Sequence, residues 1–275
     1  MSEVAPPVTA RADVRREIRH NQWLAALVLT PVVAVVFVAG SLVGVLVGLG
    51  VPGVLVGLVL AAAVATVAYR LADRVALGGA QARPAAKAQF RRYHNLVEGL
   101  CIAAGLPKPN LAVVDDPALN AFTTGRNPKH ATLVVTTGLL RDLNRLELEG
   151  VLAHELCHVK RHDPLVATVA VVAVPPVALV AAPLAARLTA ATLRPDREFV
   201  ADAAGVQLTR YPPGLTSALR KLEAAPAAVR HAPRASAPLW IDSPLARAAD
   251  ASSWRNRAFE THPPLDQRIE LLDAT

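Results

Sequence analysis

The sequence RLELEGVLAHELCHVKR, residues 145–161, reads as one helix with a well-marked start. Asn144 precedes it as a suitable N-cap, and Glu147, three residues later, completes a capping box. Apolar residues recur on one face at the helical spacing of three and four residues; they are Leu148, Leu152, Leu156 and Val159. We expect that face to pack into the core, which fixes the position of the neighbouring polar face.

The neighbouring polar face carries His154, Glu155 and His158. Histidines four residues apart stand one turn apart on a helix, so both imidazoles can reach a single Zn²⁺ ion. The glutamate lies beside this pair, where it can act as a general base and take a proton from a zinc-bound water. This is the H-E-x-x-H arrangement of metalloproteases. The alternative is a pair of solvated helix histidines, and the rest of the chain has to decide between the two.

A candidate for a third metal ligand lies further along the chain. A catalytic zinc needs a third protein ligand and one open position. Pro195 suits the first turn of a helix, and that helix carries Glu198 and Asp202 one turn apart on the same face. Glu198 is the best candidate for the ligand, and Asp202 can then hydrogen-bond a liganding histidine from behind. Alone, Glu198 reads as an ordinary helix carboxylate; beside two histidines it completes a zinc site.

The N-terminal part of the chain predicts two membrane spans. No charged residue occurs from Leu24 to Tyr69. A bilayer core about 30 Å thick needs about 20 apolar residues per helix, so this run is long enough for two spans. The stretch Gly50–Gly53 supplies the turn between them. A buried hairpin in a soluble protein is the alternative, and a secretory signal peptide fits poorly because its apolar core is shorter.

The net charge of +7 is placed around these spans rather than in a nucleic-acid-binding patch. The basic residues are Arg11, Arg15, Arg16 and Arg19 before the first span, and Arg70, Arg74, Arg83, Lys87, Arg91 and Arg92 after the second. Basic flanks mark the cytoplasmic side, so both ends of the hairpin are expected inside the plasma membrane, close to anionic lipid. The two cysteines, Cys101 and Cys157, agree with a reducing compartment. We therefore expect a lipid bilayer as partner and no nucleic acid.

This reading divides the chain into a cytoplasmic basic tail at 1–22, a transmembrane helical hairpin at 23–70, and a metalloprotease domain at 71–275. An apolar insert at 164–193, interrupted by prolines, separates the two parts of the zinc site. Since both parts must meet at one metal, the insert cannot cross the membrane once. Two crossings would need about 40 residues. We expect a bent helical hairpin, either shallowly inserted in the membrane or packed against the spans.

The remaining elements are short. Helical spacing from Phe90 ends at Gly105, and a last short helix is expected over Leu265–Leu272. Three β-like runs separated by turn residues lie between these helices; they are Leu111–Val114, Ala121–Thr124 and Thr132–Thr136. Residues 223–253, rich in Ala, Pro and Ser, predict a long surface loop.

Several of these motifs together resemble a known family. They are His-Glu-Leu-Cys-His at 154–158, Val-Lys-Arg-His-Asp at 159–163, Arg-Glu-Phe-Val-Ala-Asp at 197–202, Asn-Ala-Phe-Thr-Thr-Gly at 120–125, Thr-Thr-Gly-Leu-Leu at 136–140, and Thr-His-Pro-Pro at 261–264 with Arg268. The set is similar, in the same order over roughly residues 85–275, to the M48 zinc metalloendopeptidases, and in particular to the HtpX-like membrane proteases of bacterial quality control.

The resemblance implies a mostly helical α+β fold of the zincin type, with a small antiparallel sheet above the zinc helix. It implies one zinc ion per chain bound by His154, His158 and Glu198, with Glu155 as general base and Asp202 behind the ligands. It also implies that Asn120, Ala121 and Phe122 form an edge strand for the substrate. His262 would stabilise the oxyanion of the intermediate or, alternatively, cap the final helix.

Two departures from the family pattern stand out. Cys157 occupies a position where a small residue such as Ser or Gly is usual, and on the helix it points away from the face between the histidines. The insert at 164–193 is also shorter than the further pair of spans that HtpX-like proteins commonly carry.

The function expected from all this is a membrane-anchored endopeptidase that cleaves membrane or membrane-adjacent polypeptides. Alternatives are a catalytically idle zinc-binding scaffold and a prenyl-protein protease of the same family. A channel component is less favoured, because the two spans contain no ionisable residue. The sequence leaves the natural substrate, the regulation and the oligomeric state open.

Overall fold

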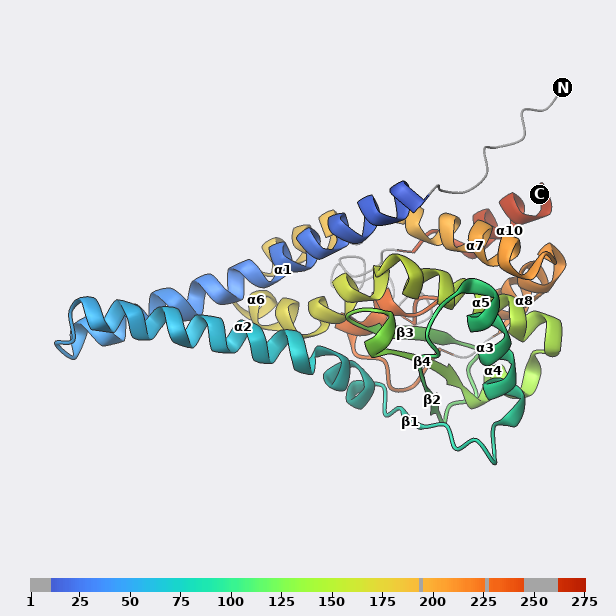
Figure 1. The fold of residues 1–275 in the computed structure, drawn as a ribbon, viewed down its shortest axis with the longest axis horizontal. Coiled ribbons are helices and arrows are strands. Elements are labelled where there is room, and N and C mark those ends of the chain that lie inside the picture. The colour runs from blue at the N-terminus through green and yellow to red at the C-terminus, as the bar shows by residue number, and fades with distance from the viewer. Residues whose placement is uncertain (1–10, 193–194, 226–227, 245–261) are drawn as a thin grey trace, which may run out of the picture.

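Two long helices project from the rest of the chain in the computed structural model, which describes residues 11–192, 195–225, 228–244 and 262–275 (Figure 1). They are α1 (Arg11–Leu46) and α2 (Val51–Gly79). Within the described residues, these are the two helices long and apolar enough to cross a bilayer. Only 6% of the most apolar window of α1 and 17% of that of α2 are buried, unlike the core helices of a soluble protein.

Glycines hold α1 and α2 together near their tips. Gly40 and Gly44 on α1 face Gly57 and Gly53 on α2, so each helix contributes two glycines four residues apart. A Cβ atom on Gly44 would lie 2.5 Å from the Cα atom of Gly53, which no real side chain tolerates. Such small residues let two membrane helices approach closely and gain van der Waals contact where no hydrophobic effect drives them together.

The helix ends differ from the predicted domain boundaries. α1 begins at Arg11, so residues 11–22 of the predicted basic tail are helical, and α2 continues to Gly79, beyond the predicted end of the hairpin at 70. The division into 1–22, 23–70 and 71–275 therefore stays a prediction.

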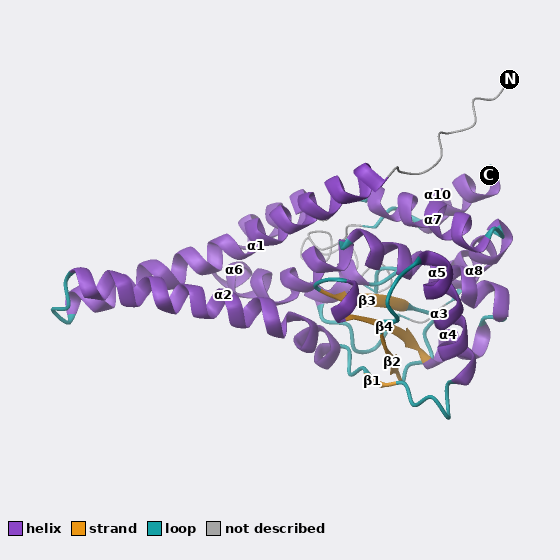
Figure 2. Cartoon of the chain, viewed as in Figure 1, coloured by secondary structure: helices purple, strands orange, loops and turns teal. Residues whose placement is uncertain are grey.

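The part of the chain that follows α2 contains a four-stranded sheet (Figure 2). Its strands are β1 (Arg83–Pro84), β2 (Asn110–Val114), β3 (Ala121–Gly125) and β4 (Ala131–Thr136), in the order β1-β2-β4-β3. β3 and β4 form an antiparallel hairpin, and β4 lies between β3 and β2. Because β4 is inserted there, it runs parallel to β2, and the prediction of a purely antiparallel sheet is wrong in this detail. The three β-like runs in the sequence are confirmed as strands.

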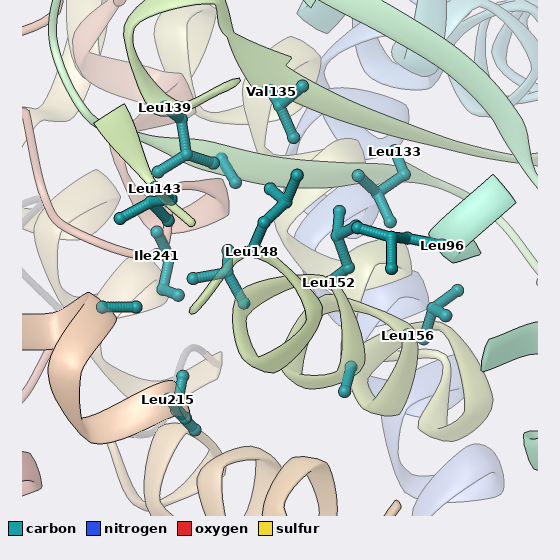
Figure 3. Packing of buried hydrophobic residues seen from close by; sticks show 14 of the residues in the cluster. Leu96, Leu133, Val135, Leu139, Leu143, Leu148, Leu152, Leu156, Leu215 and Ile241 are labelled. Atoms are coloured by element: carbon teal, nitrogen blue, oxygen red, sulfur yellow. The ribbon is translucent and has the colours of Figure 1, made fainter. Parts of the chain in front are cut away.

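Helices cover this sheet. The short helices α3 (Arg91–Ala104) and α4 (Thr137–Asp142) come before α5 (Arg145–Arg161), and a 3₁₀ turn, η1 (Pro128–His130), connects β3 to β4. α5 lays its apolar face into the core beneath the sheet, where Leu148, Leu152 and Leu156 meet Leu133 and Val135 of β4 (Figure 3). The predicted capping box is present, with the Asn144 side chain accepting from the Glu147 amide at 3.0 Å and Glu147 accepting from the Asn144 amide at 2.8 Å.

The apolar insert forms α6 (Asp163–Thr192), assigned as one helix of 30 residues. A straight helix of that length would extend about 45 Å, and the five residues to Arg197 span at most about 18 Å. Asp163 and Arg197 nevertheless line the same cavity, so α6 must fold back on itself. The bend that the sequence predicts for the insert is therefore required, although residues 163–192 stay helical without a separate turn. α6 packs along α1 and α2.

The last elements are α7 (Asp196–Thr209), α8 (Pro212–Ala224), a 3₁₀ turn η2 (Arg234–Leu239) and α10 (Leu265–Asp273). Of these, α7 and α8 pack against α5. The prediction of a surface loop over 223–253 is wrong for the described residues 237–241, which are buried. The Ala- and Pro-rich composition there conceals the apolar run Leu239–Ile241, while 226–227 and 245–253 lie outside the described residues.

We predict that Asn144→Ala lowers the free energy of unfolding by about 1 kcal/mol, because the amide of Glu147 loses its acceptor at the start of α5. Urea unfolding of the full-length protein in detergent measures this. Asn144→Asp, which keeps a capping oxygen, is the matched control. Equal midpoints for Asn144→Ala and the wild type would show that the cap does not hold the helix.

Candidate metal centre

Three predicted ligands from two helices meet at one point. His154 and His158 on α5 place their Nε2 atoms 3.2 Å apart. Glu198 on α7 places its Oε2 atom 3.4 Å from Nε2 of His154 and 3.6 Å from Nε2 of His158. All three residues are buried, and one ligand atom from each lies within 4.8 Å of the others. The chain therefore brings together residues 40 positions apart that the sequence predicted as one site.

A glycine allows α7 to come this close to α5. A Cβ atom on Gly205 would lie 3.0 Å from the amide nitrogen of His154 and 3.1 Å from its Cα atom. These distances are tighter than ordinary packing, so a larger residue at this position would push the helix of Glu198 away from the histidines.

The outward nitrogens of both histidines contact carboxylates. Nδ1 of His154 lies 2.8 Å from Oδ1 of Asp202, and Nδ1 of His158 lies 2.9 Å from Oδ2 of Asp163. A carboxylate on Nδ1 fixes the ring and keeps the Nε2 lone pair free for a metal. Asp202 lies where the sequence predicted it. The position of Asp163 behind His158 was missed, although an aspartate just beyond the end of α5 is a signal that could have found it.

The donor set fits a divalent cation that prefers nitrogen and oxygen ligands. Oε2 of Glu198 is buried and has no hydrogen-bond partner among the described residues. Burial disfavours its charge, but the neighbouring histidines His158, His154 and His262 together outweigh this effect and hold the pKa of the Glu198 carboxyl well below its usual range. Nη1 of Arg268 lies 3.6 Å from this oxygen, so it has a charged neighbour but no hydrogen bond. A buried carboxylate oxygen without a hydrogen bond is costly, and a cation held between it and the two Nε2 atoms would satisfy it.

Glu155 lies next to this cluster on α5. Its Oε2 atom accepts a hydrogen bond from Oγ1 of Thr123 on β3 at 2.7 Å. Burial raises the pKa of the Glu155 carboxyl, against the opposing effect of His154 and His158. Both Glu155 and Thr123 line a cavity of about 20 Å³ together with the predicted ligands. A cavity of that size has room for about one water molecule and none for a peptide.

Arg268 on α10 fixes the position of Asp202, the carboxylate behind His154. Its Nε and Nη2 atoms each donate to one oxygen of Asp202 at 2.7 Å, and its Nη1 atom donates to the carbonyl of Ile241 at 2.9 Å. The side chain is fully buried, and such a two-bonded pair fixes orientation as well as charge. Arg268 stood in the sequence only as part of a motif, and its partner could not be read from spacing.

His262 lies at the edge of the cluster, with Nε2 3.8 Å from Oε1 of Glu198. The N-cap of α10 is Pro264, so His262 does not occupy the capping position that was its alternative role. Its part in stabilising an oxyanion stays a prediction. Cys157 faces a different cavity, and burial raises the pKa of its thiol to about 12, so it is a neutral packing residue.

The predicted substrate strand is covered by the chain itself. The amide of Ile241 donates to the carbonyl of Ala121 at 2.9 Å, and the Asn120 side chain donates to the carbonyl of Asp242 at 2.7 Å. The ring of Trp240 packs on Phe122 with centroids 4.4 Å apart. A peptide can therefore add to this edge only if residues 240–242 move away. The substrate role of Asn120, Ala121 and Phe122 stays a prediction.

Comparison with known proteins points to one family. The model of peptidase family M48 matches residues 87–275. The protein named "Protease HtpX homolog" of Dictyoglomus thermophilum is 38% identical over 255 residues, covering 82% of each chain. The protein of the same name from Tropheryma whipplei strain Twist is 38% identical over 246 residues, covering 78% of this chain and 83% of the relative. The one from Pyrococcus furiosus is 35% identical over 273 residues, covering 86% and 91%.

We predict that Arg268→Met lowers the free energy of unfolding by about 3–5 kcal/mol, because the Asp202 carboxylate is left buried without its partner. Adding Asp202→Asn should recover part of this loss, since no uncompensated charge then remains. Urea unfolding of the metal-free protein measures both, as a double-mutant cycle. Additive effects of the two substitutions would contradict the pairing.

Proposed function

The chain belongs to peptidase family M48, and we propose that it is a membrane-anchored zinc metalloendopeptidase. The chain is a protease and a membrane protein, with a His-His-Glu cluster able to hold a metal. The identity of the metal, the mechanism, the substrates and the orientation in the membrane are proposed below.

One observation carries the proposal. The ligand atoms of His154, His158 and Glu198 converge while a carboxylate occupies the outward nitrogen of each histidine. Two imidazoles and one carboxylate form a set that zinc uses in catalytic sites, which keep a fourth position open. We therefore assign these three residues as ligands of one zinc ion per chain.

The chain's own residues supply the proton transfers. A bound zinc ion would contribute Lewis-acid chemistry, polarising the peptide carbonyl and making water reactive near neutral pH. Glu155 takes the proton of the attacking water at its carboxylate and passes it to the leaving amine. Thr123 holds one oxygen of this carboxylate at 2.7 Å, which keeps the other available for the proton. His262 supports the oxyanion from the edge of the cluster.

The substrates in this proposal are membrane or membrane-adjacent polypeptides, as in protein quality control. An extended peptide would add to β3 at Asn120–Phe122 once residues 240–242 are displaced. α1 and α2 would cross the plasma membrane as two spans, with basic residues on both inner flanks, so the catalytic domain faces the cytoplasm.

A catalytically idle zinc-binding scaffold is the second candidate. It shares the metal cluster, but it gives no reason for a buried Glu155 held by Thr123 beside the metal cluster. A prenyl-protein protease differs in substrate only, and its enclosure of the site in many spans is not matched by the two candidate spans of the described chain.

We predict that the purified protein binds one zinc ion and cleaves casein, and that Glu155→Gln keeps the zinc but lowers kcat by about 100-fold or more. Glu149→Gln, the same substitution on the same helix away from the cluster, should retain activity. Zinc content is measured by mass spectrometry of the metal, and cleavage by release of labelled fragments.

A chelator should abolish this cleavage, and added zinc should restore it. Zinc binding without any cleavage by the wild type would favour the scaffold, and cleavage by Glu155→Gln at the wild-type rate would rule out its role as base.

We predict that a cysteine placed at Leu49, in the exposed turn between α1 and α2, reacts with an impermeant maleimide on intact cells. A cysteine at Lys87, after α2, should react only after permeabilisation. The wild type is the background control, because Cys101 and Cys157 are buried. The reverse pattern would place the catalytic domain outside.

A further inference from the structure

The N-terminal part of α1 contacts Asp163, the carboxylate behind the predicted ligand His158. Asn21 lies on α1, before the apolar run begins at Leu24. The first part of α1 runs beside the rest of the chain (Figure 1). The Nδ2 atom of Asn21 donates to Oδ1 of Asp163 at 2.8 Å and lies 3.2 Å from the carbonyl of Arg161. These contacts join residues 142 and 140 positions apart.

Asp163 uses its two oxygens for two different tasks. Oδ1 accepts from Asn21, and Oδ2 contacts Nδ1 of His158 at 2.9 Å. The residue is buried, and it is the first residue of α6, directly after His162 ends α5 in the left-handed conformation. The position of Asp163 therefore depends on the sharp turn between α5 and α6. Asn21 on α1 contacts both sides of this turn, at Arg161 and at Asp163.

A second contact holds the same junction. Oε1 of Glu17, one turn before Asn21 on α1, lies 2.8 Å from Nη2 of Arg161. The Arg161 side chain is 12% exposed and that of Glu17 33%, so solvent screening leaves this ion pair a modest contribution. From α1, Asn21 contacts the Asp163 carboxylate directly, whereas Glu17 acts through Arg161, whose Nε atom lies 3.5 Å from Oδ2 of Asp163.

We propose that Asn21 is a positioning residue of the metal centre: it holds the Asp163 carboxylate so that His158 directs Nε2 toward the metal. This rests on the proposed function, in which His158 is a zinc ligand. An amide suits the position because it donates a hydrogen bond to a carboxylate without adding charge. The helix that enters the membrane is in this way part of the zinc site, although it supplies no ligand.

The effect should appear in metal affinity. Removing a hydrogen-bonding partner directly behind a zinc ligand typically weakens binding by about 10- to 100-fold. Asn21 acts one residue further out, so we expect Asn21→Ala to weaken zinc binding by about 10-fold, at the lower end of that range. Asn21→Asp has nearly the same shape but places a second carboxylate against Asp163, so its loss should be larger.

The test uses the full-length protein in detergent. Zinc affinity is measured by competition with a chelator for the wild type, Asn21→Ala, Asn21→Asp and the control Gln22→Ala, which removes the adjacent, exposed amide side chain. Thermal unfolding of each metal-free protein separates positioning from general stability. Casein cleavage at saturating zinc, split into kcat and KM, is the second readout.

We expect zinc binding to be weakest in Asn21→Asp, intermediate in Asn21→Ala, and strongest in the control Gln22→Ala and the wild type. The metal-free melting temperatures of Asn21→Ala and Gln22→Ala should be alike. Zinc affinities of both Asn21 variants equal to that of Gln22→Ala would overturn the proposal while leaving the proposed function intact. A melting temperature that falls in proportion to the loss of affinity would also overturn it, in favour of a structural role. A wild type that binds no zinc would overturn both.

Discussion

The structure depends on bringing one buried carboxylate against two imidazoles from another helix. Glu198 on α7 has to reach His154 and His158 on α5, and an apolar insert of 30 helical residues lies between them. This requirement explains why α6 folds back and why Gly205 stands where α7 touches the backbone of α5. It also explains the buried pairs around the site, because a charge cluster this deep is tolerated only when each member has a partner.

The parts of this arrangement that follow local rules were predictable from sequence. The capping box and the apolar face of α5 depend on spacings of three and four residues, and so does the pair Glu198 and Asp202 on α7. Partners that meet through tertiary packing were not predictable: Asp163 behind His158, Arg268 on Asp202, and residues 240–242 along β3. The sheet order was missed for the same reason, since β-like runs show which segments are strands and not which strands are neighbours.

The membrane helices contact the metal centre directly through α1. Glycine contacts hold α1 against α2 near the turn between them. Toward its N-terminus, α1 contacts the α5–α6 junction behind His158 through Asn21 and Glu17. Residues 238–241 line a cavity of about 20 Å³ together with the predicted ligands. The described residues therefore bring the predicted catalytic groups together, and a peptide can add to the edge of β3 only if residues 240–242 move away.

X-ray absorption at the zinc edge can show whether two histidines and one carboxylate bind the metal. For the full-length protein with one equivalent of zinc, we expect nitrogen and oxygen neighbours at about 2.0–2.2 Å, with imidazole scattering from two rings and no sulfur. The imidazole scattering should disappear in the double variant His154→Ala/His158→Ala. A sulfur neighbour at about 2.3 Å, or imidazole scattering that persists in the double variant, would contradict the account.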